Sequence, residues 1–164
     1  MQDYHKFVTT TFVSCPLIPD LALAWLQLLE EVGELMEAIV EDAPTQVIKS
    51  ELGDVLYWFA LIGNQLNWSL PDSSKVDDLG SAFKPMLPIL LGATGIVKRI
   101  FRDDQGVLTY ARRGLLLTEL ELAYYHFVSL CAMYGYTPEA IAKGNMQKLN
   151  RRLEQGTIVG EGDR

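Results

Sequence analysis

Apolar residues recur every three or four positions through most of the chain, which is the spacing of one face of an α-helix. One long run precedes Pro44 and contains Leu21, Trp25, Leu28, Leu29, Val32, Leu35, Met36 and Ile39. A second run follows Pro44 and contains Val47, Ile48, Leu52, Val55, Leu56, Phe59, Ile62 and Leu66. Both runs extend well beyond the usual length of a β-strand. The pattern therefore predicts two long amphipathic helices joined by a short turn.

Residues that start or stop helices place the other predicted boundaries. Asp20 and Thr45 are the expected N-caps of the two long helices, and Thr137, followed by Pro138, is the expected start of the last one. The predicted helices cover about residues 3–12, 21–41, 46–67, 89–101, 112–134 and 138–153. No strand pattern of any length is visible in the sequence. We therefore expect an all-α fold, a bundle of about six helices.

Acidic residues interrupt the two long apolar runs at helical spacing. Glu30, Glu31 and Glu34 belong to the first run, and Glu51 and Asp54 belong to the second. Helical residues three apart are neighbours, so Glu31 projects with Glu34, and Glu51 projects with Asp54. In an antiparallel hairpin the two pairs can face each other. Carboxylates among apolar side chains need a cation, and hard oxygen ligands suit Mg²⁺ or Mn²⁺.

These positions suggest separate roles for the acids. The predicted metal ligands are Glu31, Glu34, Glu51 and Asp54. Glu30 lies about 100° around the helix from Glu31, where it can hold a second metal ion or orient an attacking water molecule. The alternative is an ordinary solvated helix face, which we assign only to Glu37 and Glu41. Metal ions held by carboxylates commonly bind substrate phosphates, so phosphate chemistry is the expected activity.

An internal repeat is a further candidate feature of the sequence. The segment Leu28–Glu34 can be aligned with Leu90–Ile96, and Glu51–Asp54 can be aligned with Glu119–Leu122. Only Glu119 then remains acidic, because the other acids align with Gly92, Ala93, Ile96 and Leu122. We expect one domain over residues 1–164, divided into a metal-binding repeat at 1–70, a linker at 71–88 and, at 89–164, a degenerate repeat with a C-terminal tail. The repeat suggests an internal pseudo-dimer of helical hairpins.

The paired motifs E-E-x-x-E and E-x-x-D resemble the signature of the MazG-like all-α nucleoside triphosphate pyrophosphohydrolases. Asn145–Arg152 and Gly160–Arg164 resemble the N-x-x-K-L-x-x-R and G-x-G-D-x-R ending of phage and bacterial members. Tyr4, Thr10 and Thr11 resemble the first helix of the family more weakly. The resemblance implies hydrolysis of a (deoxy)nucleoside triphosphate between its α and β phosphates, giving a nucleoside monophosphate and pyrophosphate. It also implies a metal-ligand set of Glu31, Glu34, Glu51 and Asp54, with Glu30 assisting the water.

Basic residues near the C-terminus are candidate phosphate contacts. Lys148 and Arg152 are four residues apart on one helix face, and Asn145 lies one turn earlier. We expect them to contact phosphate or to order the C-terminal tail, which can itself fold over a phosphate. The alternative is that they are surface residues favoured by the helix dipole. A weaker set of candidate cations is Lys98, Arg99 and Arg102.

Aromatic residues near the acids are candidates for stacking on the nucleotide base. Trp58 follows Asp54 by one helical turn, and Trp25 precedes the first acidic motif. The alternative for both tryptophans is an ordinary position in the hydrophobic core. His126 lies in an apolar helix and is expected to be a packed core residue rather than a metal ligand.

Composition restricts the partners that we expect. The 164-residue chain has a net charge of −7, which argues against nucleic acid or an anionic membrane surface as the main partner. No apolar run is long enough for a membrane span, and the polar N-terminus is unlike a signal peptide. Cys15 and Cys131 are expected to be reduced thiols in a cytoplasmic protein. Wide apolar faces near Leu21–Leu29 and Leu115–Leu117 favour a homodimer.

Two other classes of function compete with the hydrolase. A di-iron or di-manganese carboxylate bundle requires E-x-x-H motifs, and neither histidine follows a Glu at that spacing. A catalytically decayed helical scaffold or nucleotide-binding module is the stronger alternative, because the second copy has lost most of its acids. The intact first copy argues against decay of the whole chain.

Overall fold

The computed structural model describes residues 1–12, 19–72 and 86–157. The helices of these segments are α1 (Gln2–Thr11), α2 (Asp20–Val40), α3 (Thr45–Gln65), α4 (Met86–Arg102), α5 (Tyr110–Met133) and α6 (Pro138–Glu154). No β-strand occurs within the described segments. The predicted all-α fold with about six helices is confirmed.

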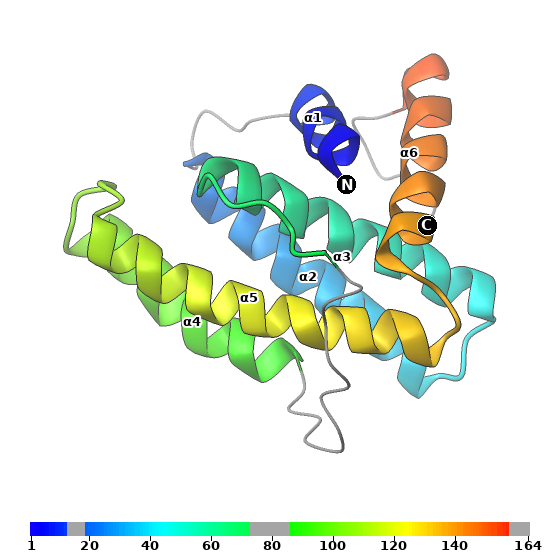
Figure 1. The fold of residues 1–164 in the computed structure, drawn as a ribbon, viewed down its shortest axis with the longest axis horizontal. Coiled ribbons are helices and arrows are strands. Elements are labelled where there is room, and N and C mark those ends of the chain that lie inside the picture. The colour runs from blue at the N-terminus through cyan, green and yellow to red at the C-terminus, as the bar shows by residue number, and fades with distance from the viewer. Residues whose placement is uncertain (13–18, 73–85, 158–164) are drawn as a thin grey trace.

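Two helical hairpins form the body of the fold. α2 and α3 pack as one antiparallel pair, and α4 and α5 pack as another (Figure 1). The hairpins meet chiefly where α2 packs against α4. α1 and α6 pack against the outer side of α3, so that α6 stands across its N-terminal half (Figure 1). This arrangement makes α3 the helix that connects the N-terminal, C-terminal and central parts of the molecule.

The central position of α3 explains its composition. Its neighbours include α1, α2, α5 and α6, and its core side chains include Leu52, Leu56, Phe59 and Ile62, all fully buried. A helix that is covered on several sides is apolar around most of its circumference, unlike a surface helix with a single apolar stripe. Polar side chains on such a helix therefore need partners from the helices packed against it.

Several predicted boundaries differ from the observed ones. Asp20 and Thr45 are not N-caps, because each is the first residue of its helix and the capping positions are Pro19 and Pro44. The fixed φ of proline suits the start of a helix without a side-chain cap. Thr137 is confirmed as a cap, since its Oγ1 accepts a hydrogen bond of 3.2 Å from the backbone N–H of Ala140.

The second hairpin also starts earlier than the sequence pattern predicts. α4 begins at Met86, so the last residues of the predicted linker at 71–88 are helical. α5 begins at Tyr110 and is capped by Thr109, whose Oγ1 accepts a hydrogen bond from the backbone N–H of Arg112. Met86 is buried in the core, which gives the first turn of α4 a packing reason to form.

The paired hairpins are the arrangement expected of a pseudo-dimer, although the division into repeats stays a prediction. Trp25 of α2 joins the two hairpins by donating a hydrogen bond of 3.0 Å from Nε1 to Oγ1 of Thr94 on α4. In the aligned second copy, Ala93 and Ile96 are buried, whereas Gly92 and Leu122 are exposed. In the second hairpin, some of the residues that replace acids, Ala93 and Ile96, therefore pack in the core.

α5 meets the length and composition criteria of a membrane-spanning helix, with a mean hydropathy of 1.2. Half of its most apolar window is buried inside the fold, and the core helix of a soluble protein passes the same test. Cys131 on this helix is a buried thiol without a disulfide partner among the described residues, and burial raises its pKa to about 12. Cys15 lies outside the described residues.

Candidate metal and phosphate site

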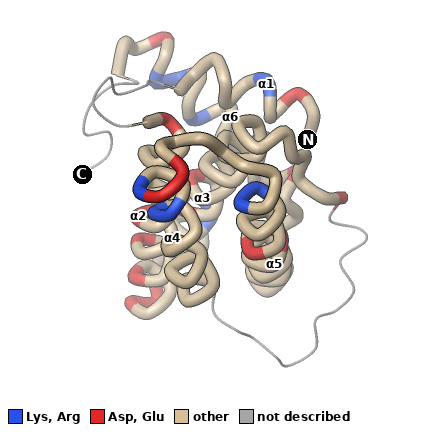
Figure 2. Tube along the Cα trace, turned by 90° about the vertical axis from the view of Figure 1, so that its left-hand side faces the viewer, with Lys and Arg blue, Asp and Glu red and all other residues tan. Residues whose placement is uncertain are grey.

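Three of the predicted acids meet between α2 and α3. Glu31 projects from α2, and Glu51 and Asp54 project from successive turns of α3. One carboxylate oxygen from each of the three residues lies within 4.8 Å of the others. Acidic positions recur along α2 (Figure 2), but only Glu31 of that helix joins this group. We call Glu31, Glu51 and Asp54 the acidic cluster.

The electrostatics of the acidic cluster fit a divalent cation. Burial, and next the charge of Asp54, raise the pKa of Glu31 from 4.5 to about 7. Burial and the charge of Asp54 also raise the pKa of Glu51, while Lys148 acts in the opposite direction. Partly buried carboxylates this close repel one another, so their ionised forms need more positive charge than one lysine supplies. An all-oxygen donor set of this kind suits Mg²⁺ or Mn²⁺.

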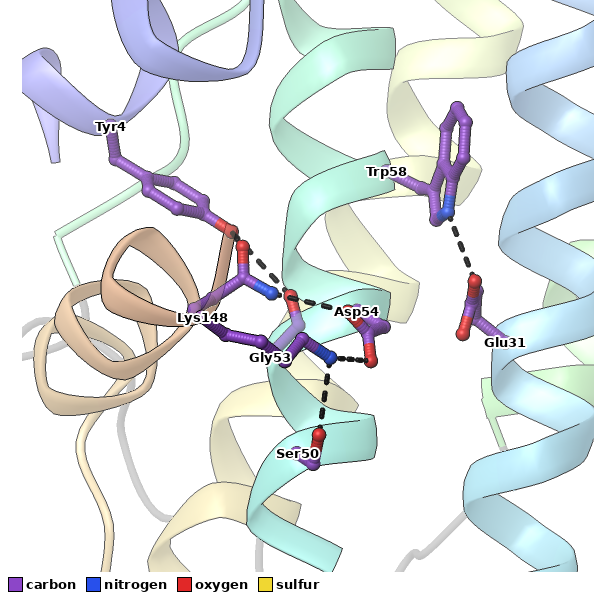
Figure 3. Close-up of polar contacts among 8 residues, drawn as sticks. Tyr4, Glu31, Ser50, Gly53, Asp54, Trp58 and Lys148 are labelled. Atoms are coloured by element: carbon purple, nitrogen blue, oxygen red, sulfur yellow. Dashed lines mark hydrogen bonds and ion pairs between the residues drawn. The ribbon is translucent and has the colours of Figure 1, made fainter. Parts of the chain in front are cut away.

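Asp54 receives hydrogen bonds from two residues of α6. Nζ of Lys148 donates to Oδ2 of Asp54 in a short ion pair, and also donates to Oγ of Ser50 at 3.1 Å (Figure 3). Nδ2 of Asn145 donates to Oδ1 of Asp54 at 3.2 Å. Asn145 and Lys148, which were predicted as substrate contacts, are therefore held directly beside the acidic cluster.

Tyr4 extends this network to α1. Its hydroxyl donates to Oδ1 of Asn145 at 2.8 Å and lies 3.5 Å from the carbonyl oxygen of Gly53 (Figure 3). Both Tyr4 and Asn145 are almost completely buried. A Cβ at Gly53 would lie 3.1 Å from both Cβ and Nδ2 of Asn145, so the absence of a side chain lets α6 approach α3 closely. Tyr4 and Gly53 therefore determine how Asn145 is presented to Asp54.

Trp58 contacts the acidic cluster from its other side. Its Nε1 donates a hydrogen bond of 3.4 Å to Oε1 of Glu31 (Figure 3), which partly offsets the increase in the pKa of that carboxyl group. The indole packs edge-to-face with Phe12 and Tyr57, at ring-centroid distances of 6.2 Å and 5.1 Å. Trp58 therefore makes a polar contact with Glu31, and its stacking on a base stays a prediction.

The remaining predicted acids lie at the edge of the cluster. Glu34 is exposed and outside the group of three, but its charge raises the pKa of both Glu31 and Glu51. Glu30 is also exposed and accepts a hydrogen bond of 2.6 Å from Nε2 of Gln27. Glu34 is therefore close enough to influence a bound ion, whereas Glu30 faces solvent beside the cluster.

The other candidate residues have different environments. Trp25 and His126 are buried, as expected of core residues. Arg102 pairs with Asp103 at the C-terminal end of α4, away from the α3–α6 contact. Arg152 is half-buried near the end of α6 and does not line the groove between α3 and α6. The predicted phosphate contact through residues 160–164 lies outside the described residues.

A groove between α3 and α6 opens beside the acidic cluster. It has a volume of about 520 Å³. Its walls include Ser50, Glu51, Asn145 and Lys148, so it shares residues with the cluster and with the partners of Asp54. Sequence reasoning found Asn145 and Lys148 but missed Ser50, because only the packing of α6 brings Lys148 over the first half of α3.

Comparison with known proteins identifies the segment that holds the acids. Residues 22–75 match the family model of the MazG nucleotide pyrophosphohydrolase domain. The chain is also similar to the gene 37 protein of Mycobacterium phage L5, with 33% identity over 67 residues. That alignment covers 41% of this chain and 59% of the phage protein, so the chain matches less than two thirds of its relative. No solved structure matches the chain. The predicted resemblance is confirmed over residues 22–75.

Proposed function

Because residues 22–75 match the MazG nucleotide pyrophosphohydrolase domain, we propose that this chain hydrolyses nucleoside or deoxynucleoside triphosphates between the α and β phosphates. The observation that carries the proposal is the meeting of Glu31, Glu51 and Asp54 inside the matched segment. Water and the triphosphate give a nucleoside monophosphate, pyrophosphate and a proton. One phosphoanhydride bond breaks, and the oxygen of water remains on one product.

The chain's carboxylates would hold the divalent cation that the proposed reaction requires. Glu31, Glu51 and Asp54 are the proposed ligands, and Glu34 is a further ligand at the exposed edge. When bound, Mg²⁺ or Mn²⁺ offsets the charge of the phosphates and increases the acidity of water at the site. The closely spaced carboxylates of Glu31, Glu51 and Asp54 repel one another when ionised, and this repulsion would be relieved by a bound divalent cation.

The remaining residues position the ligands and the substrate. Asn145 orients Asp54 and Trp58 orients Glu31, through the hydrogen bonds described above. Lys148 supplies a positive charge between the cluster and the groove, where it can contact a phosphate oxygen. Glu30 lies beside the cluster with its carboxylate in solvent, which is suitable for orienting a water molecule. Trp58 and Arg152 remain proposed substrate contacts.

A nucleotide-binding module without turnover is the second candidate function. It is favoured by the ion pair between Lys148 and Asp54, because this lysine already neutralises one carboxylate that a metal ion would use. It is also favoured by the loss of acids in the second hairpin. Turnover separates the two candidates, since both bind nucleotide but only the enzyme releases pyrophosphate.

The experiment is a pyrophosphate-release screen over all canonical NTPs and dNTPs with Mg²⁺ and with Mn²⁺. Asp54→Asn is run beside the wild type, and Glu119→Gln on α5 is the matched control, because Glu119 aligns with the acidic motif but lies outside the cluster. Release of pyrophosphate and monophosphate by the wild type and the control, but not by Asp54→Asn, supports the enzyme. Metal-dependent nucleotide binding by folded protein without any release supports the binding module.

A homodimer is the assembly that we expect, with no nucleic acid or membrane partner. Its support is the exposure of Leu26 on α2 and Leu91 on α4, each more than half exposed although the two helices pack together. Light scattering coupled to size-exclusion chromatography measures the mass. A monomer at micromolar concentration would contradict this assembly.

A further inference from the structure

The groove between α3 and α6 is more positively charged than the molecule around it. Among the described residues, its lining includes the cations Lys49, Lys148 and Arg151, and the one carboxylate in that lining belongs to Glu51. Lys148 is also paired with Asp54 beside the groove, so Lys49 and Arg151 supply the excess of positive charge. The chain as a whole carries a net charge of −7. A local reversal of sign in a concave site raises the concentration of an anionic ligand there. The groove therefore suits an anion, although the whole protein does not.

Lys49 and Arg151 have no carboxylate partner among the described residues. In the part of the chain that the structure describes, the basic residues that form ion pairs are Arg102, Arg112 and Lys148. Nζ of Lys49 lies 5.1 Å from the ring centroid of Tyr136, and Nε of Arg151 donates to the backbone oxygen of Gln147 at 3.4 Å. Neither contact involves a carboxylate, so both cations stay at the groove without an acidic partner among the described residues.

The lining also indicates which part of a nucleotide fits. It combines the cations with Gln46, Ser50, Asn145 and Gln147, and within the described part of the chain no aromatic side chain lines it. Bases commonly stack on aromatic rings, whereas phosphates take hydrogen bonds from lysine, arginine, amide and hydroxyl groups. The volume of about 520 Å³ lies within the usual range of small-ligand sites. Phosphate groups fit this lining better than a base or a sugar.

The position of the groove beside the acidic cluster determines which end of a bound triphosphate enters it. Glu51 belongs both to the acidic cluster and to the groove wall, and Lys148 contacts Asp54 while also lining the groove. A phosphate chain that is cleaved at the cluster can therefore continue directly into the groove. The terminal phosphate ionises twice, so the pyrophosphate end carries most of the negative charge of a triphosphate. Because Lys49 and Arg151 line the groove, the pyrophosphate end of the triphosphate is the part that is best stabilised there.

We propose that the α3–α6 groove binds the pyrophosphate end of the triphosphate, and the pyrophosphate product, with Lys49 and Arg151 as phosphate contacts. This inference rests on the proposed function, and it adds two residues that the acidic motifs do not include. It places the nucleoside on the opposite side of the cluster from the groove. Product pyrophosphate is then a competitive inhibitor whose affinity depends on Lys49 and Arg151.

The test compares Lys49→Met, Arg151→Met and the double variant with Lys143→Met, an exposed lysine of α6 outside this groove. Methionine keeps an unbranched apolar stem and removes the charged end of the side chain together with its hydrogen-bond donors. Circular dichroism tests whether each variant is folded. The measurements are the KM of the nucleotide identified in the screen and the inhibition constants of pyrophosphate and nucleoside monophosphate. We expect each groove variant to raise the KM and the pyrophosphate inhibition constant about tenfold, which is about 1.4 kcal/mol of lost binding.

The monophosphate inhibition constant is expected to stay unchanged in the groove variants, and Lys143→Met is expected to behave as wild type. Unchanged pyrophosphate inhibition in an active, folded double variant would overturn the groove assignment and leave the hydrolase standing. If the wild type has no turnover, the proposed hydrolase fails, and calorimetry with inorganic pyrophosphate and Mg²⁺ then tests the groove directly. Binding that is lost in the double variant supports the groove, and no binding by the wild type overturns it.

Discussion

Asn145 donates a hydrogen bond of 3.2 Å from its side-chain amide to Oδ1 of Asp54, although the two residues are 91 positions apart in the chain. This contact joins the C-terminal helix to the acidic motif of α3. The match to the MazG domain ends at residue 75, so the partners that orient Asp54 come from outside the matched segment. The candidate site is therefore built from α1, α2, α3 and α6 together, and variants far in sequence from the acidic motifs are expected to alter it.

Tyr4→Phe tests the outer part of this network. This substitution removes the hydroxyl that donates a hydrogen bond of 2.8 Å to Oδ1 of Asn145, and it keeps the buried ring. We expect a loss of about 1 kcal/mol in the free energy of unfolding, because a buried amide oxygen loses its donor. We also expect weaker metal-dependent activity, since Asn145 no longer holds Asp54 in one orientation.

Denaturant unfolding and a titration of activity against Mg²⁺ measure these two effects. Tyr110→Phe is the matched control, because Tyr110 is 90% exposed. An unchanged metal requirement in Tyr4→Phe, together with lower stability, would show that Tyr4 is only structural.

Gly53→Ala tests the close approach of α6 to α3. The new Cβ would lie 3.1 Å from two atoms of Asn145, so the side chain that donates to Asp54 must be displaced. We expect a destabilisation of about 1–3 kcal/mol from overpacking, together with loss of activity. Thermal unfolding and pyrophosphate release are the measurements.

The control for this substitution is Gly33→Ala on α2, where a Cβ meets no atom within 4 Å. Because alanine is the better helix former, the control is expected to be more stable by up to about 1 kcal/mol. Equal effects of the two substitutions would contradict the packing argument.

The stability of the metal-free protein is expected to fall as the pH rises from about 4.5 to about 7. The pKa of Glu31 is raised from 4.5 to about 7, so the folded state binds more protons than the unfolded state over this range. The loss is complete above the folded pKa and amounts to at most about 3 kcal/mol. Below pH 4.5 the carboxyl group is protonated in both states, so its contribution no longer changes.

Thermal unfolding in a chelator at pH 5 and pH 8 measures this dependence, and Glu31→Gln should reduce it. Addition of Mg²⁺ or Mn²⁺ should restore stability mainly at pH 8, where the carboxylates are ionised. Metal stabilisation of equal size at both pH values would indicate that the ion binds elsewhere.

Glu34→Gln tests the exposed edge of the cluster. Glu34 is exposed, so its neutralisation should leave folding unchanged. Because it is a proposed metal ligand, we expect turnover to fall on the order of a hundredfold or more. Steady-state pyrophosphate release is the measurement, and Glu37→Gln, one turn further along α2, is the control. Full activity in Glu34→Gln would remove this residue from the metal site.

Much of the fold was predictable from the sequence because local patterns carry it. Apolar spacing together with helix start and stop signals predicted every helix that the structure describes, and Thr137 was recognised as a cap from its residue type and the proline that follows it. The N-cap positions of α2 and α3 were misplaced by one residue, because Asp20 and Thr45 are typical capping residues, whereas Pro19 and Pro44 occupy those positions without a side-chain cap. The start of α4 was missed because its first turn is stabilised by burial of Met86, which is a tertiary contact.

The acidic motifs, and hence the class of chemistry that we propose, were determined by the sequence itself. Residues three apart on a helix must share a face, so the pairing of Glu51 with Asp54 needed no structure. Only the tertiary structure decided that Glu31, rather than Glu34, completes the acidic cluster. It also brought Tyr4 and Asn145 to Asp54, and opened the groove beside Lys148. These contacts join residues far apart in the chain, and their geometry depends on how the helices pack rather than on any local pattern.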